Sequence, residues 1–294
     1  ALERVGLDKK LLEVAVPMRG RMVHAIDGGL TFQPYGHEAH HVIHSVSRGG
    51  LNRLLVEAAE AMPNVEVLFG KRCVGVDLEN ATGVFADIDT GMNESVTADL
   101  LIGADGAFSE VRLAMQQTDR FEYAQSYLEH GYKELTIPAA DRGGFRMERN
   151  ALHIWPRGGF MMIALPNVDG SYTCTCFWPF AGANSFSALA SREEVRSYFS
   201  KVFPDAVPLM PSLEEDFLLN AVGSLVTVRC APWRFKDRVA LLGDAAHAVV
   251  PFYGQGANAA FEDCIVLDEC LRTFPGDLAE ALDTYERRRK RHAD

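Results

Sequence analysis

The sequence contains no apolar run of about eighteen residues, the length that a membrane-spanning helix needs. It also contains no CxxC pair, although it has six cysteines. Cys174 and Cys176 share one face of a predicted strand, whereas Cys264 and Cys270 fall on different faces of a predicted helix. These absences exclude a membrane span within the 294 residues and argue against a disulfide framework or a zinc ribbon. We predict reduced, mostly buried thiols.

Basic residues are scarce relative to acidic ones: 29 Lys and Arg against 40 Asp and Glu give a formal net charge of −11. This balance excludes nucleic acid as a partner, because proteins that bind it present a basic surface. The one basic run, Arg287 to Arg291, ends a helical pattern and is typical of a solvated helix end. With 48% hydrophobic and 23% charged residues, the composition is that of a globular protein with a sizeable core.

Two kinds of pattern alternate along the chain. Residues 127–228 carry short alternating segments such as SYTCTCFW, which predict an antiparallel sheet interrupted by one helix over 192–203. The runs 100–102 and 239–243 are continuously apolar and lead into Gly-Ala-Asp or Gly-Asp, as buried parallel strands do before a functional turn. We also predict strands within 14–32, a helix after Arg48, a strand over 65–69, a hairpin over 74–88 and a helix over 256–274.

The first functional turn reads LLIGADGAFSEVR (residues 100–112). Gly106 allows a tight turn and a close backbone approach, and Ser109 or Glu110 can start a helix. Asp105 then lies at the carboxyl end of a strand, where α/β folds bind ligands. Because a strand, turn and helix can contain Asp-Gly by chance, this segment alone does not distinguish a ligand site from a structural turn.

The second turn reads LLGDAAHAVVPFYGQGANAAFEDC (residues 241–264). Asp244 follows a buried strand, and a carboxylate there suits a ribityl or ribose hydroxyl better than a phosphate. Residues 256–258 begin a helix without bulky side chains, so free N–H groups and a partial positive charge are available to a reduced flavin. The structural alternative is a helix cap packed on a sheet. We predict a flavin ring against this turn.

Together, DGAFSEVR and GDAAHAVVPFYGQGANAAFED resemble the two internal signatures of the single-component (class A) FAD-dependent aromatic hydroxylases. The resemblance covers essentially the whole chain. Within that family it is most specific to the kynurenine 3-monooxygenases, which carry PMRGRMVH, SVSR, HGYKELTIP, LHIWPR, FMMIALPN and FPDA in this order. It implies a mixed α/β (α+β) fold of the FAD-binding hydroxylase type, in which a partial Rossmann-like domain is interleaved with an antiparallel substrate-binding sheet.

The resemblance also implies domain boundaries: substrate-domain strands at 1–40, FAD-binding segments at 41–115 and 233–294, and the antiparallel substrate domain at 116–232. The family's GxGxxG motif, which holds the ADP half of FAD, does not occur in the 294 residues, nor do the family's C-terminal helices. Both ends of the sequence are interpreted as cuts through a longer protein. We therefore expect these residues alone to hold FAD poorly and not to turn over, whereas the full-length enzyme does.

Roles for individual residues follow from the same resemblance. Arg21 matches a clamp for the substrate α-carboxylate and Tyr35 its hydroxyl partner, since a guanidinium binds a carboxylate through a bidentate fork. The implied FAD contacts are Arg48, Cys73, Asp105, Asp244, Ala257 and Asn258. The implied pocket lining beside the ring is Tyr172, Phe180, Phe252 and Gln255, with core packing as the alternative for Tyr172 and Phe180. No residue is assigned as a catalytic acid or base.

The implied reaction is hydroxylation of L-kynurenine to 3-hydroxykynurenine by an FAD-dependent monooxygenase that consumes NADPH and O2, in tryptophan catabolism and NAD biosynthesis. The aniline nitrogen of this substrate already donates electrons to the ring, so no strong base is required. Two alternatives stay open: a related hydroxylase acting on a phenolic acid or a quinone precursor, and a non-catalytic remnant of the fold. The expected location is the cytoplasm for a bacterial protein, or the mitochondrial outer membrane for a parent with a C-terminal anchor. A homodimer is left open.

The segment HEAHH, residues 37–41, satisfies the HExxH pattern of zinc proteases. That chemistry requires His37 and His41 one turn apart on a helix. Here the segment follows Pro34-Tyr35-Gly36 and runs into a strand-like stretch. We therefore favour a solvated turn with chance histidines and predict no metal site; helical structure over residues 36–44 would favour the zinc alternative.

Overall fold

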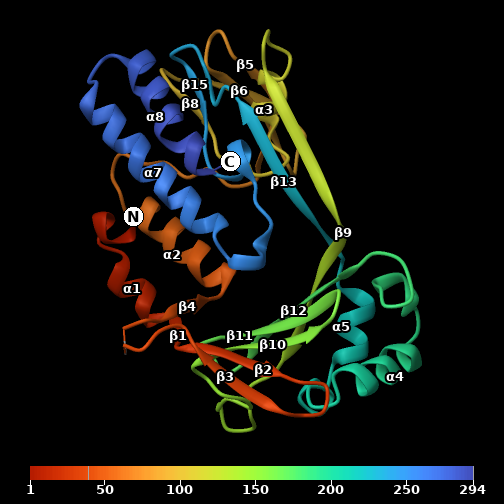
Figure 1. Cartoon of the computed structure of the whole chain (residues 1–294). Helices are drawn as coiled ribbons and strands as arrows, with labels where there is room; N and C mark the ends of the chain where they lie inside the picture. The colour runs from red at the N-terminus through yellow and green to blue at the C-terminus, as the bar shows by residue number, and fades with distance from the viewer. Residues whose placement is uncertain (39, 294) are drawn as a thin grey trace. The chain divides into compact units, whose positions relative to one another are not determined.

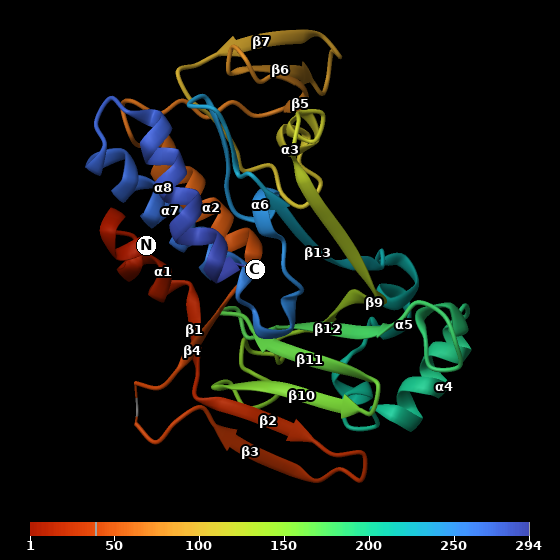
Figure 2. The same cartoon turned by 45° about the horizontal axis from the view of Figure 1, so that its top comes forward.

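The computed structural model describes residues 1–38 and 40–293. The chain divides into two compact units, each assembled from separated stretches of sequence (Figure 1). The first unit comprises Val67–Tyr127 and Leu225–Asp294 together with Ala1, and the second comprises Leu2–Glu66 and Leu128–Ser224. Two long strands, β9 (Glu122–Ile137) and β13 (Gly223–Ala231), carry the chain from one unit to the other (Figure 2).

The first unit contains a short sheet of three strands in the order β14–β15–β8. Strand β15 (Val239–Leu241) pairs in parallel with β8 (Leu101–Gly103) and antiparallel with β14 (Arg234–Phe235). All three residues of β15 are buried, in an apolar cluster that includes residues of helices α7 (Gly256–Thr273) and α8 (Leu278–Ala293). The remaining elements of this unit are β5 (Lys71–Asp77), β6 (Thr82–Asp87) and β7 (Asn93–Thr97), which form an antiparallel sheet, and α3 (Glu110–Met115), α6 (Asp244–His247) and η4 (Pro251–Tyr253).

The large sheet has the strand order β13–β9–β12–β11–β10–β2–β3. In the second unit its strands are β9, β12 (Tyr172–Pro179), β11 (Phe160–Pro166), β10 (Ala151–Arg157), β2 (Gly20–His24) and β3 (Leu30–Pro34). Strands β10 and β2 are parallel, whereas the other pairs from β9 to β3 are antiparallel. The unit also contains β1 (Ala15–Met18) paired with β4 (Ile43–Val46), the helices α1 (Asp8–Glu13), α2 (Arg48–Glu60), α4 (Arg192–Val202) and α5 (Leu213–Leu219), and the short turns η1 (Leu2–Val5), η2 (Phe186–Ala188) and η3 (Val207–Leu209).

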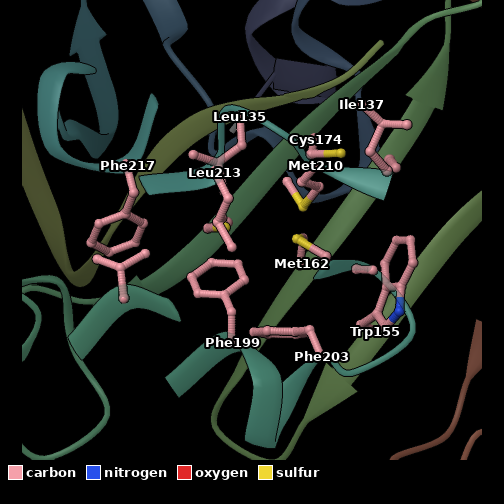
Figure 3. Close-up of a cluster of buried hydrophobic side chains, with 14 of the residues drawn as sticks. Leu135, Ile137, Trp155, Met162, Cys174, Phe199, Phe203, Met210, Leu213 and Phe217 are labelled. Atoms are coloured by element: carbon pink, nitrogen blue, oxygen red, sulfur yellow. The ribbon is translucent and has the colours of Figure 1, made fainter. Parts of the chain in front are cut away.

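Alternation along β12 builds the core of the second unit. Tyr172, Cys174, Cys176 and Trp178 are all fully buried, as residues on one face of a strand covered by helices should be. Figure 3 shows the aromatic and sulfur-containing side chains from strands and helices that meet in this cluster. Helix α4 starts with a capping box in which the Ser191 hydroxyl and the Glu194 carboxylate each accept from the other residue's backbone amide.

Most of the predicted elements are confirmed, including the parallel pair β8–β15, the hairpin β5–β6 and the helices α2, α4 and α7. The strand predicted over residues 65–69 is wrong: this segment has no regular structure, and Leu68 and Phe69 are 55% and 66% exposed. A strand needs a neighbour for its backbone hydrogen bonds, and no described segment pairs with this one. The region predicted to hold one helix also contains α5.

Two further predictions concern the state of the cysteines and the presence of a membrane-spanning helix. All six cysteines are free, and four of them are buried, as predicted. Across residues 1–38 and 40–293, no helix is both long and apolar enough to cross a bilayer.

Candidate functional site

Two aspartates follow neighbouring parallel strands of the first unit. The register pairs Gly103 of β8 with Leu241 of β15, and the Leu242 amide donates to the Gly103 carbonyl (N···O 2.9 Å). Asp105 and Asp244 come two and three residues after these strands end. Because the carboxyl ends of parallel strands meet at the same edge of a sheet, both predicted corners lie at that edge.

At the first corner, Asp105 caps helix α3. Its Oδ2 accepts from the backbone amides of Glu110 (2.8 Å) and Val111 (3.3 Å), and Ser109 Oγ accepts from the Arg112 amide (2.9 Å). The residue is nevertheless exposed, so its carboxylate stays accessible to a hydroxyl group of a ligand. The corner is thus held rigidly by its own short helix.

Arg112 connects the two corners. Its side chain is 2% exposed and donates from Nη2 to the Ala107 carbonyl (2.6 Å) and from Nη1 to the Ala245 carbonyl (2.7 Å). Ala107 belongs to the loop after β8, whereas Ala245 directly follows Asp244. No role was predicted for Arg112, although DGAFSEVR contains it, because its second partner lies 133 residues away in the chain.

The second corner depends on two glycines: Gly243, which packs against α7, and Gly256, which begins that helix. Gly243 has φ 61° and ψ −139°, and a Cβ on it would lie 3.2 Å from the Ala260 Cβ. A Cβ on Gly256 would lie 3.9 Å from Asp244 Oδ1, so the Asp244 carboxylate lies at the start of α7. Desolvation raises the pKa of Asp244, and the electrostatic interaction with His247 opposes that rise.

Helix α7 is 18 residues long and begins without a hydrogen bond from a capping side chain. The Gln255 amide donates to the Tyr253 carbonyl (3.0 Å), and its oxygen accepts from Asn258 Nδ2 (3.1 Å). Ala257 and Asn258 are exposed. An uncapped helix start presents N–H donors and a partial positive charge, which suit a ligand group that carries or develops negative charge.

Cys73 and Phe252, the other predicted residues of the first unit, differ in burial. Cys73 in β5 is half-buried; burial raises the pKa of its thiol, and the negative charge of Asp105 contributes to the rise. Phe252 in η4 is 41% exposed and stands directly before the stretch that begins α7. Cys73 therefore lies near the first corner, and Phe252 lies between the second corner and α7.

In the second unit, Arg21 and Tyr35 lie together. The Arg21 guanidinium carbon is 5.4 Å from the centre of the Tyr35 ring, and the backbone of Tyr35 is held by Arg19 through an N–H···O bond of 2.9 Å. The Tyr35 hydroxyl is buried, and within residues 1–38 and 40–293 no acceptor lies at hydrogen-bond distance from it; Arg21, which has only donors, is its polar neighbour. Desolvation raises the pKa of this hydroxyl, although Arg21 opposes the rise. The hydroxyl is therefore neutral and free to donate to a ligand that reaches it.

The remaining predicted residues of the second unit have different surroundings. Tyr172 is fully buried in the core, and its hydroxyl donates to the Met147 carbonyl (2.8 Å). Phe180 is 37% exposed and lies against Gly131, where a Cβ would come within 2.8 Å of its ring. Arg48 is exposed as the first residue of α2. The structure therefore offers Phe180 and Arg48 to a ligand more readily than Tyr172.

The HEAHH segment is not helical in its described part. His37, Glu38, His40 and His41 are exposed, whereas Ala39 lies outside the described residues. Ligand atoms of Glu38, His40 and His41 lie within 4.8 Å of one another, and His40 Nδ1 is 3.2 Å from Glu38 Oε2. The helical arrangement of His37 and His41 that a zinc protease requires does not occur among these residues, which favours the solvated turn.

The sequence profile of the FAD binding domain family matches residues 1–294. The chain belongs to this family. Kynurenine 3-monooxygenase of Salinispora arenicola (strain CNS-205) is 52% identical over 294 residues, 100% of this chain and 64% of that enzyme. The enzyme of the same name from Dictyostelium discoideum is 46% identical over 305 residues, 100% of this chain and 65% of the relative. The chain thus spans slightly less than two thirds of the length of these relatives.

The structure of 2-methyl-3-hydroxypyridine-5-carboxylic acid oxygenase in its tetrameric form superposes on this FAD binding domain with a TM-score of 0.79 at 21% identity, covering 100% of this chain and 74% of that one. This similarity confirms the predicted fold class of a FAD-binding hydroxylase. The family match confirms the predicted cofactor, FAD. The resemblance to kynurenine 3-monooxygenases, drawn from short motifs, is confirmed by identity over the whole chain.

The first unit of this FAD binding domain has the donors and acceptors that FAD requires. Carboxylates at Asp105 and Asp244 can accept from its hydroxyl groups, and the small residues Gly256 and Ala257 leave the start of α7 open to a ring. The structure thus places the predicted Asp105 and Asp244 after neighbouring parallel strands, and Asp244 beside the start of α7, where Ala257 and Asn258 lie. Contacts of individual residues with FAD stay predictions.

Proposed function

We propose that the chain forms part of a monooxygenase that uses FAD, NADPH and O2 to hydroxylate L-kynurenine to 3-hydroxykynurenine. Relatives that carry this name are 52% and 46% identical over the whole chain. Residues 41–115 and 233–294 are proposed as FAD-binding segments, and 1–40 and 116–232 as substrate-domain segments. We also propose that the protein is located in the cytoplasm if its source is bacterial, or at the mitochondrial outer membrane if the parent protein carries an anchor.

The Arg21–Tyr35 pair is the observation that carries the substrate assignment. A buried hydroxyl without a partner costs free energy unless a ligand supplies the acceptor. The α-carboxylate of an amino-acid substrate supplies one, and the neighbouring Arg21 guanidinium neutralises its charge. These two residues would therefore fix one end of the substrate, which orients the aromatic ring for reaction.

In the first unit, the residues at the sheet edge hold the cofactor and set its electrostatics. FAD, when bound, supplies the activation of O2. Asp105 and Asp244 accept hydrogen bonds from cofactor hydroxyls, while the start of α7 stabilises negative charge on the ring. Cys73 and, from the second unit, Arg48 are proposed as further FAD contacts, and Phe252, Gln255 and Phe180 as pocket lining. The full burial of Tyr172 fits the core-packing alternative instead. No side chain of the chain is proposed as a general base.

Replacing Arg21 tests the clamp in the full-length enzyme that contains these residues. Arg21→Leu should raise the KM for L-kynurenine roughly 10- to 100-fold, because a charge-assisted bidentate contact is lost. Arg19→Leu, on an exposed side chain two residues earlier, is the matched control and should leave KM unchanged. Equal KM values for Arg21→Leu and the control would contradict the clamp.

Stimulation of NADPH oxidation distinguishes the substrate classes. L-Kynurenine should accelerate oxidation by the full-length enzyme strongly, whereas salicylate should not. The opposite result would favour a hydroxylase of phenolic acids, and bound FAD with no stimulation by either compound would favour a non-catalytic module. The 294 residues alone should hold FAD poorly, so a stoichiometric yellow complex of this piece would contradict that part of the proposal.

A further inference from the structure

The buried carboxylate of Asp263 lies directly behind the second corner. Asp263 is on α7, is fully buried and was assigned no role from the sequence. Its Oδ2 accepts from the Gly243 amide (2.9 Å) and from His247 Nε2 (2.6 Å), and its Oδ1 accepts from Arg289 Nε (2.7 Å). One side chain therefore joins the turn after β15, helix α6, helix α7 and helix α8.

The carboxylate of Asp263 forms an ion pair with Arg289, whose Nη1 also lies 2.7 Å from Glu262 Oε2. Arg289 is 2% exposed and carries a permanent positive charge. Burial by itself would raise the pKa of Asp263, but hydrogen bonds from His247, Arg289 and the Gly243 amide outweigh burial and lower it. His247 is itself held by stacking on Trp233, with ring centres 5.0 Å apart. Asp263 is therefore an ionised acceptor with a fixed set of three donors.

Two of these donors belong to the residues that enclose Asp244. Gly243 directly precedes it, and its φ of 61° directs the backbone around the corner. His247 is the last residue of α6, the short helix that Asp244 begins. Because Asp263 holds both ends of this four-residue helix, it fixes the orientation of the Asp244 carboxylate without touching a ligand itself.

We propose that Asp263 is a positioning residue for FAD, which acts by holding the Gly243–Asp244 corner and α6 in the geometry that binds the cofactor. Arg289 supplies the charge that allows a carboxylate to be buried there. This inference rests on the proposed function of the first unit. A merely structural carboxylate would stabilise the fold to the same extent whether or not Asp244 is present.

The first measurement is FAD affinity of the full-length enzyme, by quenching of flavin fluorescence on titration into apoprotein. Asp263→Asn should raise the FAD Kd about 10- to 100-fold, the effect of losing a charged acceptor. The matched control is Asp268→Asn, on the same helix, where the half-exposed carboxylate pairs with Arg272 at i,i+4. Its Kd should equal that of the unaltered enzyme.

A double-mutant cycle separates positioning from general stability. In an Asp244→Ala background, Asp263→Asn should change the FAD Kd less than twofold, because the group that it positions is gone. If Asp263 only stabilised the fold, the two effects would multiply. His247→Phe provides a second variant should Asp263→Asn fold poorly, since a ring remains against Trp233 while the donor is removed. It should show a smaller loss with the same dependence on Asp244.

The outcomes distinguish this inference from the function on which it rests. An unaltered enzyme that binds no FAD would overturn the proposed function. FAD binding that is weakened by Asp244→Ala but not by Asp263→Asn or His247→Phe would overturn only the positioning role. Multiplicative effects in the cycle would also overturn it, and leave Asp263 as a structural residue.

Discussion

In the first unit, the carboxylate of Asp263 faces His247 at 2.6 Å and Arg289 at 2.7 Å. In the second unit, the carboxylate of Asp205 faces His24 at 2.6 Å and the Trp155 indole N–H at 3.0 Å. Both are histidine–aspartate clusters in the interior of a unit. In the first, the Arg289 guanidinium bonds to the carboxylate directly and carries a permanent charge. In the second, the Arg157 guanidinium donates to the His24 carbonyl (3.0 Å) and interacts with Asp205 only electrostatically.

The second cluster is instead a chain of titratable groups. His153 Nε2 donates to the Glu148 carbonyl (2.9 Å), which can only accept. Burial lowers the pKa of His153 to about 4, so at neutral pH its Nδ1 accepts from His24 Nε2 (2.8 Å). Burial would raise the pKa of Asp205, but hydrogen bonds from His24 and Trp155 outweigh burial and lower it. The comparison teaches that a buried carboxylate bonded directly to a guanidinium keeps a permanent counter-charge, whereas a cluster that contains a buried neutral histidine depends on pH.

Removing the permanent charge should have the largest effect. Arg289→Met leaves Asp263 buried with one cation fewer, which should lower the free energy of unfolding by about 3–5 kcal/mol. Arg288→Met, at a more exposed neighbour that pairs with Glu269, should cost at most about 1 kcal/mol. Chemical denaturation at pH 7 measures both. Similar losses for the two variants would break the distinction between the clusters.

The second-largest effect expected is the loss of stability of the second cluster at acid pH. The folded-state pKa of His153 is about 4, below the ordinary histidine value of 6.5, so the unfolded chain binds more protons between these two pH values. The contribution of His153 to the free energy of unfolding is therefore fully present above pH 6.5. It falls by up to about 3 kcal/mol as the pH decreases towards 4. Denaturation across this range measures the slope.

Two histidine variants make the acid prediction specific. His153→Asn should reduce the slope of stability against pH between 6.5 and 4. His44→Asn, at an exposed histidine of the same unit, should retain it. An unchanged slope in His153→Asn would show that the second cluster does not carry the acid sensitivity.

The smallest effect is expected from a substitution that destabilises the second unit alone. Ser191→Ala removes the capping box of α4 in the second unit, which should cost about 1 kcal/mol of unfolding free energy. Ser200→Ala, at an exposed position within the same helix, is the control and should be nearly neutral. FAD affinity of the full-length enzyme should be unchanged in both; a weaker affinity in Ser191→Ala would mean that α4 influences the cofactor site.

Local patterns in the sequence were enough to predict the elements that carry the site. A continuous apolar run followed by Gly-Ala-Asp or Gly-Asp predicted β8, β15 and their corners, and small residues after Gly254 predicted the start of α7. Such features depend on neighbours within a few residues. The same reasoning made Val65–Phe69 a strand, and it failed there because pairing, which local pattern cannot supply, is what makes a strand.

The sequence by itself determined that parallel strands end in two aspartate corners, because strand periodicity and glycine turns are encoded within short windows. Only the tertiary structure decided which buried charges meet. Asp263 finds Arg289 26 residues away and Gly243 20 residues away, and His24 finds Asp205 181 residues away. It also decided that Tyr172 lies in the core and that the buried Tyr35 hydroxyl meets no acceptor in the described part of the chain. Contacts of this kind arise from packing between distant segments, and no pattern of adjacent residues specifies them.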